Sequence, residues 1–188
     1  WRTKYWGSHT YGELIYYDAP DYAHSYAMRL DTFPSDGEFA CSDPDLAFKQ
    51  LIMEAGSDIA ILEPGAYPAR LPEADHAMSQ ALNSWQANHW LDSHNNWHER
   101  WRGSICVSIE APAAAAAEIE KWAGHPYMAQ ILIKAERRPS WGDPCYDPVW
   151  AAATRHDIVV SCHLSRSHHE ELPIPPVGFP SYNHDFMC

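Results

Sequence analysis

Short, continuous apolar runs alternate with helix-like segments through residues 43–165, and this alternation constrains the fold more than any other feature. The runs SDIAILEP, GSICVSIE, MAQILIKAE and DIVVSCHLS supply strands that begin near residues 58, 104, 129 and 158. Strands that lack an in-and-out alternation are typical of parallel sheets covered on both faces. The last three starts lie 25 and 29 residues apart, which fits a strand, loop, helix and loop unit. The sequence therefore predicts an α/β protein with a parallel sheet.

Helical spacing of apolar residues marks the segments between the runs. A helix is expected with Ser42 or Asp43 as its cap, Pro44 in its first turn and Gly56 at its end; others are expected over 73–93, over 112–124 and from Asp147. The longest should bury one apolar face, made of Ala74, Ala77, Met78, Ala81, Leu82, Trp85 and Trp90. No G-x-G-x-x-G or G-x-x-x-x-G-K-[ST] motif follows a strand, which argues against nucleotide binding. We predict a partial (β/α)8 TIM barrel, with residues 1–42 as an irregular segment of the same domain and residues 43–188 as the barrel part.

The composition limits the partners and the compartment. The 188 residues carry 13 basic and 25 acidic side chains, and the net charge of -12 disfavours nucleic acid and anionic membranes. The chain has no membrane-spanning apolar run and no signal peptide, so a cytoplasmic protein is expected. Five cysteines without a C-x-x-C spacing predict no disulfide framework, and Cys106 and Cys162 are expected to be reduced core residues. Because no methionine precedes Trp1 and the chain stops at NHDFMC, we expect an internal fragment.

Ionisable residues follow the apolar runs where the strands end. Glu63, Glu110, Lys134, Glu136 and His163 occupy these positions, and in a barrel they would face the mouth. For Glu110 and Glu136 the simpler explanation is that polarity resumes outside the core. For Glu63, whose turn is fixed by the proline that follows it, substrate binding and this simpler explanation are equal alternatives. Lys134 interrupts an apolar run and requires a carboxylate or an anionic substrate as its partner.

Histidines near the end of the chain invite a metal interpretation. Neutral imidazole binds zinc and similar ions, yet a lone histidine at a strand end is more often a hydrogen-bonded structural residue. His168 is placed to reach the same site as His163, whereas His169 and Glu171 fit a solvated loop. Two further histidines, at 94 and 98, have helical i, i+4 spacing, but Asn95 replaces the glutamate of an H-E-x-x-H motif and favours a structural role.

Several phrases resemble the amidohydrolase-related family, the branch that includes aminocarboxymuconate-semialdehyde decarboxylase and the hydroxybenzoate-type decarboxylases. They are MRLDTFPSDG, DPDLAFKQLIMEAGSDIAILEP, ALNSWQANHWLDSHNNWHERWRGSICVSIE, GHPYMAQILIKAE, YDPVWAAATRHDIVVSCHLSRSH and PVGFPSYNHDF. The resemblance implies a (β/α)8 barrel with one divalent metal, usually zinc, bound by an H-x-H on the first strand, a histidine on the fifth and an aspartate on the eighth. Only His163 matches one of these ligands, the fifth-strand histidine. The chain contains no H-x-H and no counterpart of the late aspartate, so its strands would be the second to the fifth.

Two classes of function are compatible with these features. The resemblance implies an enzyme with zinc, or alternatively manganese, that hydrolyses a C–N or C–O bond or decarboxylates an unsaturated or aromatic acid. His163 would bind the metal, and Glu63, Lys134, Arg166 and His168 would bind a small-molecule substrate. A fragment with one ligand should be metal-poor, inactive and prone to associate, and exposed aromatics make a homo-oligomer plausible. The alternative is a non-catalytic half-barrel that binds an aromatic or acidic small molecule through its nine tryptophans and ten tyrosines, although core packing is the simpler role for these aromatics.

Overall fold

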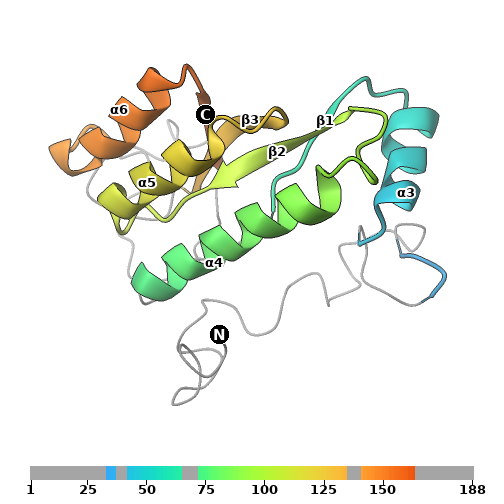
Figure 1. Ribbon diagram of the computed structural model, residues 1–188, viewed down its shortest axis with the longest axis horizontal. Helices are drawn as coiled ribbons and strands as arrows, with labels where there is room; N and C mark the ends of the chain where they lie inside the picture. Colours follow the sequence, from blue (N-terminus) through green and yellow to red (C-terminus); the bar gives the residue numbers. More distant parts are fainter. Residues whose placement is uncertain (1–32, 37–41, 65–71, 135–140, 164–188) are drawn as a thin grey trace, which may run out of the picture.

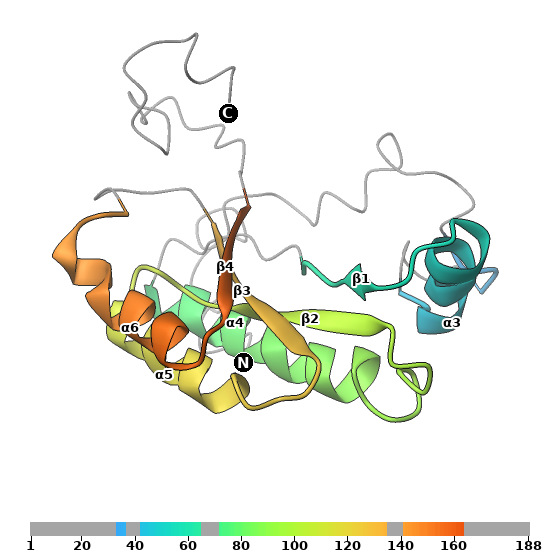
Figure 2. The same cartoon turned by 90° about the horizontal axis from the view of Figure 1, so that it is seen from above.

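Four parallel strands form one curled sheet in the order in which they occur along the chain. The computed structural model describes residues 33–36, 42–64, 72–134 and 141–163. The strands are β1 (Ala60–Ile61), β2 (Trp101–Cys106), β3 (Met128–Lys134) and β4 (Val159–His163), and the sheet order is β1-β2-β3-β4. Their direction turns strongly from β2 to β4 (Figure 2), so the sheet curls as the wall of a barrel does. The predicted α/β architecture, part of a (β/α)8 barrel, is confirmed.

Helices precede the first strand and connect the strands that follow. They are α3 (Pro44–Ala47), which continues into the π-helix η4 (Phe48–Glu54), α4 (Pro72–Trp85) with the π-helix η5 (Gln86–Trp90), α5 (Pro112–Trp122), the 3-10 helix η6 (Pro144–Tyr146) and α6 (Asp147–Arg155). Figures 1 and 2 show α4, α5 and α6 on the same side of the sheet. Within the described parts of the chain, no helix has the length and apolar character needed to span a membrane.

The first helix begins where the sequence predicts. Asp43 Oδ1 accepts hydrogen bonds from the backbone N–H groups of Asp45 at 2.9 Å and Leu46 at 3.2 Å. The helix ends before Gly56, whose φ of 75° lies in the left-handed region. Its second half is a π-helix, which is wider than an α-helix and shifts the inward face. Leu51 is exposed, while Ile52 beside it is buried.

The prediction of a buried first strand is wrong. β1 has only two residues, and Ile59 and Ile61 on either side of Ala60 are 52% and 48% exposed. Among the described strands, β1 pairs with β2 alone, so it is an edge strand. Ala60 and Leu62 pack against the helix-covered core, and the alternation of a strand then places the isoleucines on the other face.

The core lies between the sheet and the helices. Ile105, Ile131 and Ile133 of the strands pack with Ile119 of α5 and Val149 of α6. Cys106 is a buried, reduced core residue, as predicted. Cys162 is free but exposed, so its prediction as a core residue is wrong. It lies on β4, the last strand of the described sheet, where no further described element covers it.

Helix α4 and its continuation η5 fully bury only Ala74 and Trp90 of the apolar face expected from the sequence. Ser79, Asn83 and Gln86 are buried, whereas Ala81 and Trp85 are exposed. The polar face of this helix points toward the sheet because the side-chain amides of Asn83 and Gln86 bind the backbone of β2, where a neighbouring strand would otherwise pair. Burying amides is favourable only when each is hydrogen-bonded, and both are.

Asn83 and Gln86 bind alternate residues on the edge of β2 that faces β1. Asn83 accepts from the N–H of Cys106 at 2.7 Å and donates to its carbonyl at 2.9 Å. Gln86 accepts from the N–H of Ser104 at 3.1 Å and donates to its carbonyl at 2.8 Å. In the described residues, the last backbone bond from the β1 segment to β2 joins the Leu62 N–H to the Arg102 carbonyl. The amides therefore complete the edge of β2 where β1 stops pairing.

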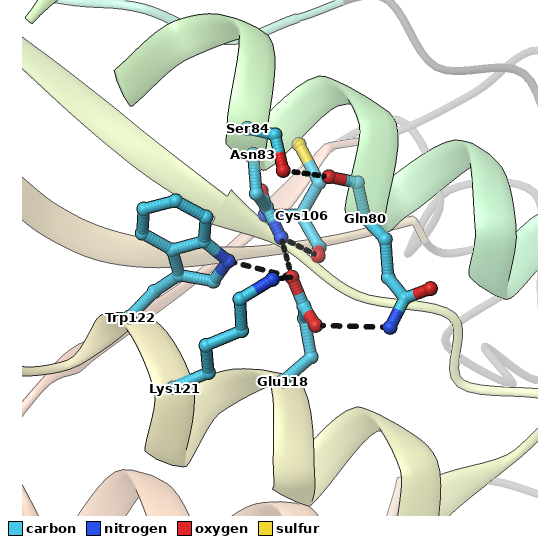
Figure 3. A network of polar contacts seen from close by, with 7 residues as sticks. All are labelled: Gln80, Asn83, Ser84, Cys106, Glu118, Lys121 and Trp122. Atoms are coloured by element: carbon cyan, nitrogen blue, oxygen red, sulfur yellow. Dashed lines mark hydrogen bonds and ion pairs between the residues drawn. The ribbon is translucent and has the colours of Figure 1, made fainter. Parts of the chain in front are cut away.

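A buried carboxylate on α5 holds this arrangement in place (Figure 3). Glu118 is almost fully buried and accepts hydrogen bonds from Asn83 Nδ2 at 3.0 Å, Trp122 Nε1 at 2.6 Å and Gln80 Nε2 at 3.4 Å. Lys121 Nζ lies 4.0 Å from the same carboxylate. These partners compensate for the loss of hydration of a buried charge, and they tie α4, α5 and β2 together.

Candidate functional site

The carboxyl ends of the four strands lie at one edge of the sheet because all the strands are parallel. At this edge Lys134 is the last residue of β3 and His163 is the last residue of β4. The two residues are register partners. Along each strand they lie an even number of positions from the register partners Gln130 and Val159, so they share a face of the sheet with that pair. Ile131, one position from Gln130, packs against the core on the opposite, helix-covered face. The candidate site therefore lies at the carboxyl edge, on the face of the sheet turned away from the helices, called here the concave face.

A polar row crosses the concave face beside this edge. Gln130 Nε2 donates to Glu63 Oε1 at 3.1 Å and to Ser104 Oγ at 2.9 Å. Ser104 Oγ in turn lies 2.6 Å from the Leu62 carbonyl, to which it donates. Three consecutive strand segments are thus joined through side chains. Ser104 and Gln130 were not predicted as site residues; each is a single polar residue inside an apolar run, and that interruption was the available signal.

The predicted site residues do not all fall within the described parts of the chain. Glu63 is exposed and follows β1, and Lys134 and His163 close their strands. Along β3 and β4 the pair Lys134 and His163 lies four positions beyond the pair Gln130 and Val159. Arg166 and His168 lie outside the described residues, as does Glu136.

A complete metal centre is not found in the described residues. They contain no group of three or more His, Cys, Asp or Glu side chains that could hold a metal ion. Open catalytic sites usually take three protein ligands, so this part of the chain does not by itself fit the metal that the family resemblance implies. His163 is the only ligand position that the resemblance assigns to it.

The histidine pair at 94 and 98 is structural, as the sequence favoured. His98 stacks on Phe48 with ring centroids 3.9 Å apart, and its Nδ1 accepts from the Arg100 N–H at 3.1 Å. Burial, followed by the charge of Arg100, lowers the pKa of His98 from its ordinary value. His94 lies on an exposed turn rather than on a helix.

A curled parallel sheet with ionisable residues at its carboxyl edge is typical of a barrel enzyme. The family model described as amidohydrolase matches residues 18–186, and the chain belongs to this family. The family resemblance predicted from the sequence phrases is confirmed.

Solved structures of a decarboxylase share the fold. Two structures of 5-carboxyvanillate decarboxylase from Novosphingobium aromaticivorans match at a TM-score of 0.51 and 21% identity. One is a mutant with manganese and 3-methoxy-4-hydroxy-5-nitrobenzoic acid; the other contains manganese and 4-hydroxy-3-methoxy-5-nitrobenzoic acid. Each match covers 60% of this chain and 32% of the neighbour, so the shared part spans about a third of the neighbour's length. No curated protein matches the chain.

Proposed function

We propose that the protein acts as a metal-dependent enzyme that decarboxylates a small aromatic or unsaturated acid without oxidation. The observation that carries the proposal is the amidohydrolase match over residues 18–186, combined with Lys134 and His163 as partners at the carboxyl edge. The decarboxylase neighbours favour this reaction over hydrolysis of a C–N or C–O bond, which the family name also allows. The net charge of -12 is compatible with the cytoplasmic location that we propose for the enzyme.

In the proposed reaction the bond between the substrate's carboxylate and its ring or alkene carbon breaks. The electron pair stays on that carbon, which takes up a proton, and carbon dioxide leaves. Lys134 and Arg166 are proposed to bind anionic groups of the substrate, since cationic side chains form charge-assisted hydrogen bonds with carboxylates. His168 and Glu63 would line the same pocket.

His163 is proposed to supply one ligand to a divalent ion, zinc or manganese. Manganese in the decarboxylase neighbours supports a divalent ion of this kind. When bound, such an ion supplies positive charge that polarises the substrate. Because the described residues supply one assigned ligand position, the other ligands must come from residues that the structure does not describe.

The test uses the natural, full-length protein. Metal content is measured by mass spectrometry in the unmodified protein, in His163→Ala and in His94→Ala, which removes an exposed histidine as a matched control. Release of carbon dioxide from 5-carboxyvanillate and related aromatic acids is measured before and after treatment with a chelator. We expect His163→Ala to lose most of the metal and the chelator to stop turnover, while His94→Ala behaves as the unmodified protein.

Three outcomes contradict the proposal. A His163→Ala protein with full metal content removes the metal role of this residue. Turnover that a chelator does not affect removes metal dependence. Binding of aromatic acids without turnover supports the non-catalytic half-barrel instead.

A further inference from the structure

Gln130 is the only described residue whose side chain binds both Glu63 and Ser104. It stands on β3 between apolar neighbours, where an amide is favourable only if it is hydrogen-bonded. Its bonds run along the concave face, so they reach toward β1 and β2 rather than toward the helices.

The chemistry of the row fixes which way the amide points. The Leu62 carbonyl can only accept, so the single hydroxyl hydrogen of Ser104 is used on it. Ser104 Oγ must then accept from Gln130, and this requires the NH₂ end of the amide to face Ser104. The second N–H of the same group faces Glu63 Oε1. The donor role of Gln130 toward the carboxylate therefore follows from the network and not only from an assigned amide orientation.

The row also brings Glu63 close to the mouth of the barrel. In a barrel of eight strands with a shear of eight, the strands are tilted relative to the barrel axis. A row of register partners at right angles to the strands therefore changes its height along the axis by about one residue from each strand to the next. Because the sheet twist and the strand connections are right-handed, such a row rises toward the carboxyl ends from β4 back to β1. Val159, Gln130 and Ser104 share the row with Glu63. In a barrel of that geometry, Glu63 is raised by about three residues relative to Val159, to the level of the end of β4.

We propose that Gln130 is a positioning residue that orients Glu63 for substrate recognition. With Oε1 held by Gln130, the other oxygen of Glu63 accepts a hydrogen bond from a hydroxyl or amino group of the substrate. Ser104 supports the arrangement by fixing the amide. This inference rests on the proposed function, since it requires a small acid bound at the carboxyl edge, and it adds the polar substituent that the site selects.

The experiment compares the binding of 4-hydroxybenzoate and benzoate to the full-length protein by titration calorimetry at pH 7. The two probes differ by one hydroxyl donor. The unmodified protein should bind 4-hydroxybenzoate about tenfold more tightly, which is the usual effect of a hydrogen bond to a charged acceptor. Glu63→Gln, Gln130→Met and the nearly isosteric Gln130→Glu should each reduce this preference to about twofold or less. The double variant Glu63→Gln with Gln130→Met should show no further loss.

A matched control is Gln80→Met, which removes another glutamine bound to a carboxylate, on the helical side of the sheet. Its preference between the two acids should stay at the level of the unmodified protein. A preference retained in both Gln130 variants, or losses that add in the double variant, would overturn the positioning role. Equal binding of the two acids by the unmodified protein, or binding of neither, also overturns it. Failure of the proposed function shows separately, as missing metal or missing carbon dioxide release.

Discussion

Lys134 and His163 occupy partner positions at the ends of neighbouring parallel strands. Adjacent strands lie about 4.8 Å apart, so a cationic position and an imidazole position are immediate neighbours at the carboxyl edge. If His163 binds a metal ion, both positions carry positive charge. A substrate carboxylate between them would relieve the repulsion, and this gives Lys134 a testable role.

Lys134→Met should weaken the binding of benzoate to the full-length protein by about tenfold or more, because a charge-assisted hydrogen bond is lost. Lys134→Arg should retain most of the affinity because it keeps the charge. The measurement is calorimetric titration at low salt. Lys121→Met, which removes an exposed lysine on α5, is the control and should bind benzoate normally. Unchanged affinity in Lys134→Met would show that the lysine does not bind the acid.

Asn83→Ala should lower the free energy of unfolding by at least about 3 kcal/mol, because buried polar groups lose their partners. The substitution leaves the N–H and carbonyl of Cys106 without their amide and removes one donor from Glu118. Urea unfolding measures the effect. Asn88→Ala, at an exposed position in η5, is the matched control and should change stability by less than about 0.5 kcal/mol. A loss below about 1 kcal/mol for Asn83→Ala would contradict the role assigned to the amide.

Glu120 links α5 to the end of α6. It is hydrogen-bonded to His156 and Arg155, and these two groups, His156 first, lower the pKa of Glu120 from its ordinary value of 4.5. A carboxyl pKa that is depressed in the folded state stabilises the fold above the unfolded value. This contribution is lost as the pH falls below 4.5 through the lower folded-state value.

Glu120→Gln should therefore reduce stability at pH 7 and have progressively less effect below about pH 4.5. Urea midpoints of the two proteins, measured from pH 7 to pH 3, should converge at the acid end. Glu54→Gln removes another exposed carboxylate, which is paired with Lys49 at 3.7 Å, and serves as the comparison. A constant difference between Glu120→Gln and the unmodified protein across this range would exclude the electrostatic explanation.

The order of helices and strands was predictable because it depends on local features. Asp43 with Pro44 marks a helix start, and apolar runs of the MAQILIKAE kind mark strands. The family resemblance was also visible in the sequence. Burial was predicted less well, because apolar character alone does not say which side of an element is covered. Ile61 and Cys162 are exposed for this reason, on the first and last strands of the described sheet.

The polar interactions could not be predicted from periodicity. Asn83 and Gln86 look like solvent-facing positions of an amphipathic helix, and their burial depends on where β1 stops pairing with β2. Gln130 and Ser104 are joined only once β2 and β3 are in register. His163 was identified as a candidate from its place after an apolar run, and its register with Lys134 required the structure.

Because the amide groups of Asn83 and Gln86 bind β2, the first strand of the sheet can open separately from the second. Since they, and not β1, hold the backbone of Ser104 and Cys106, β1 can detach without breaking the backbone hydrogen bonds of those two residues. Of their bonds to the described β1 segment, only the one from the Ser104 hydroxyl to the Leu62 carbonyl is given up. Amide hydrogens on Ala60 and Leu62 should then exchange with solvent through a local opening, whereas those on Ser104 and Cys106 should exchange only when α4 itself leaves the sheet.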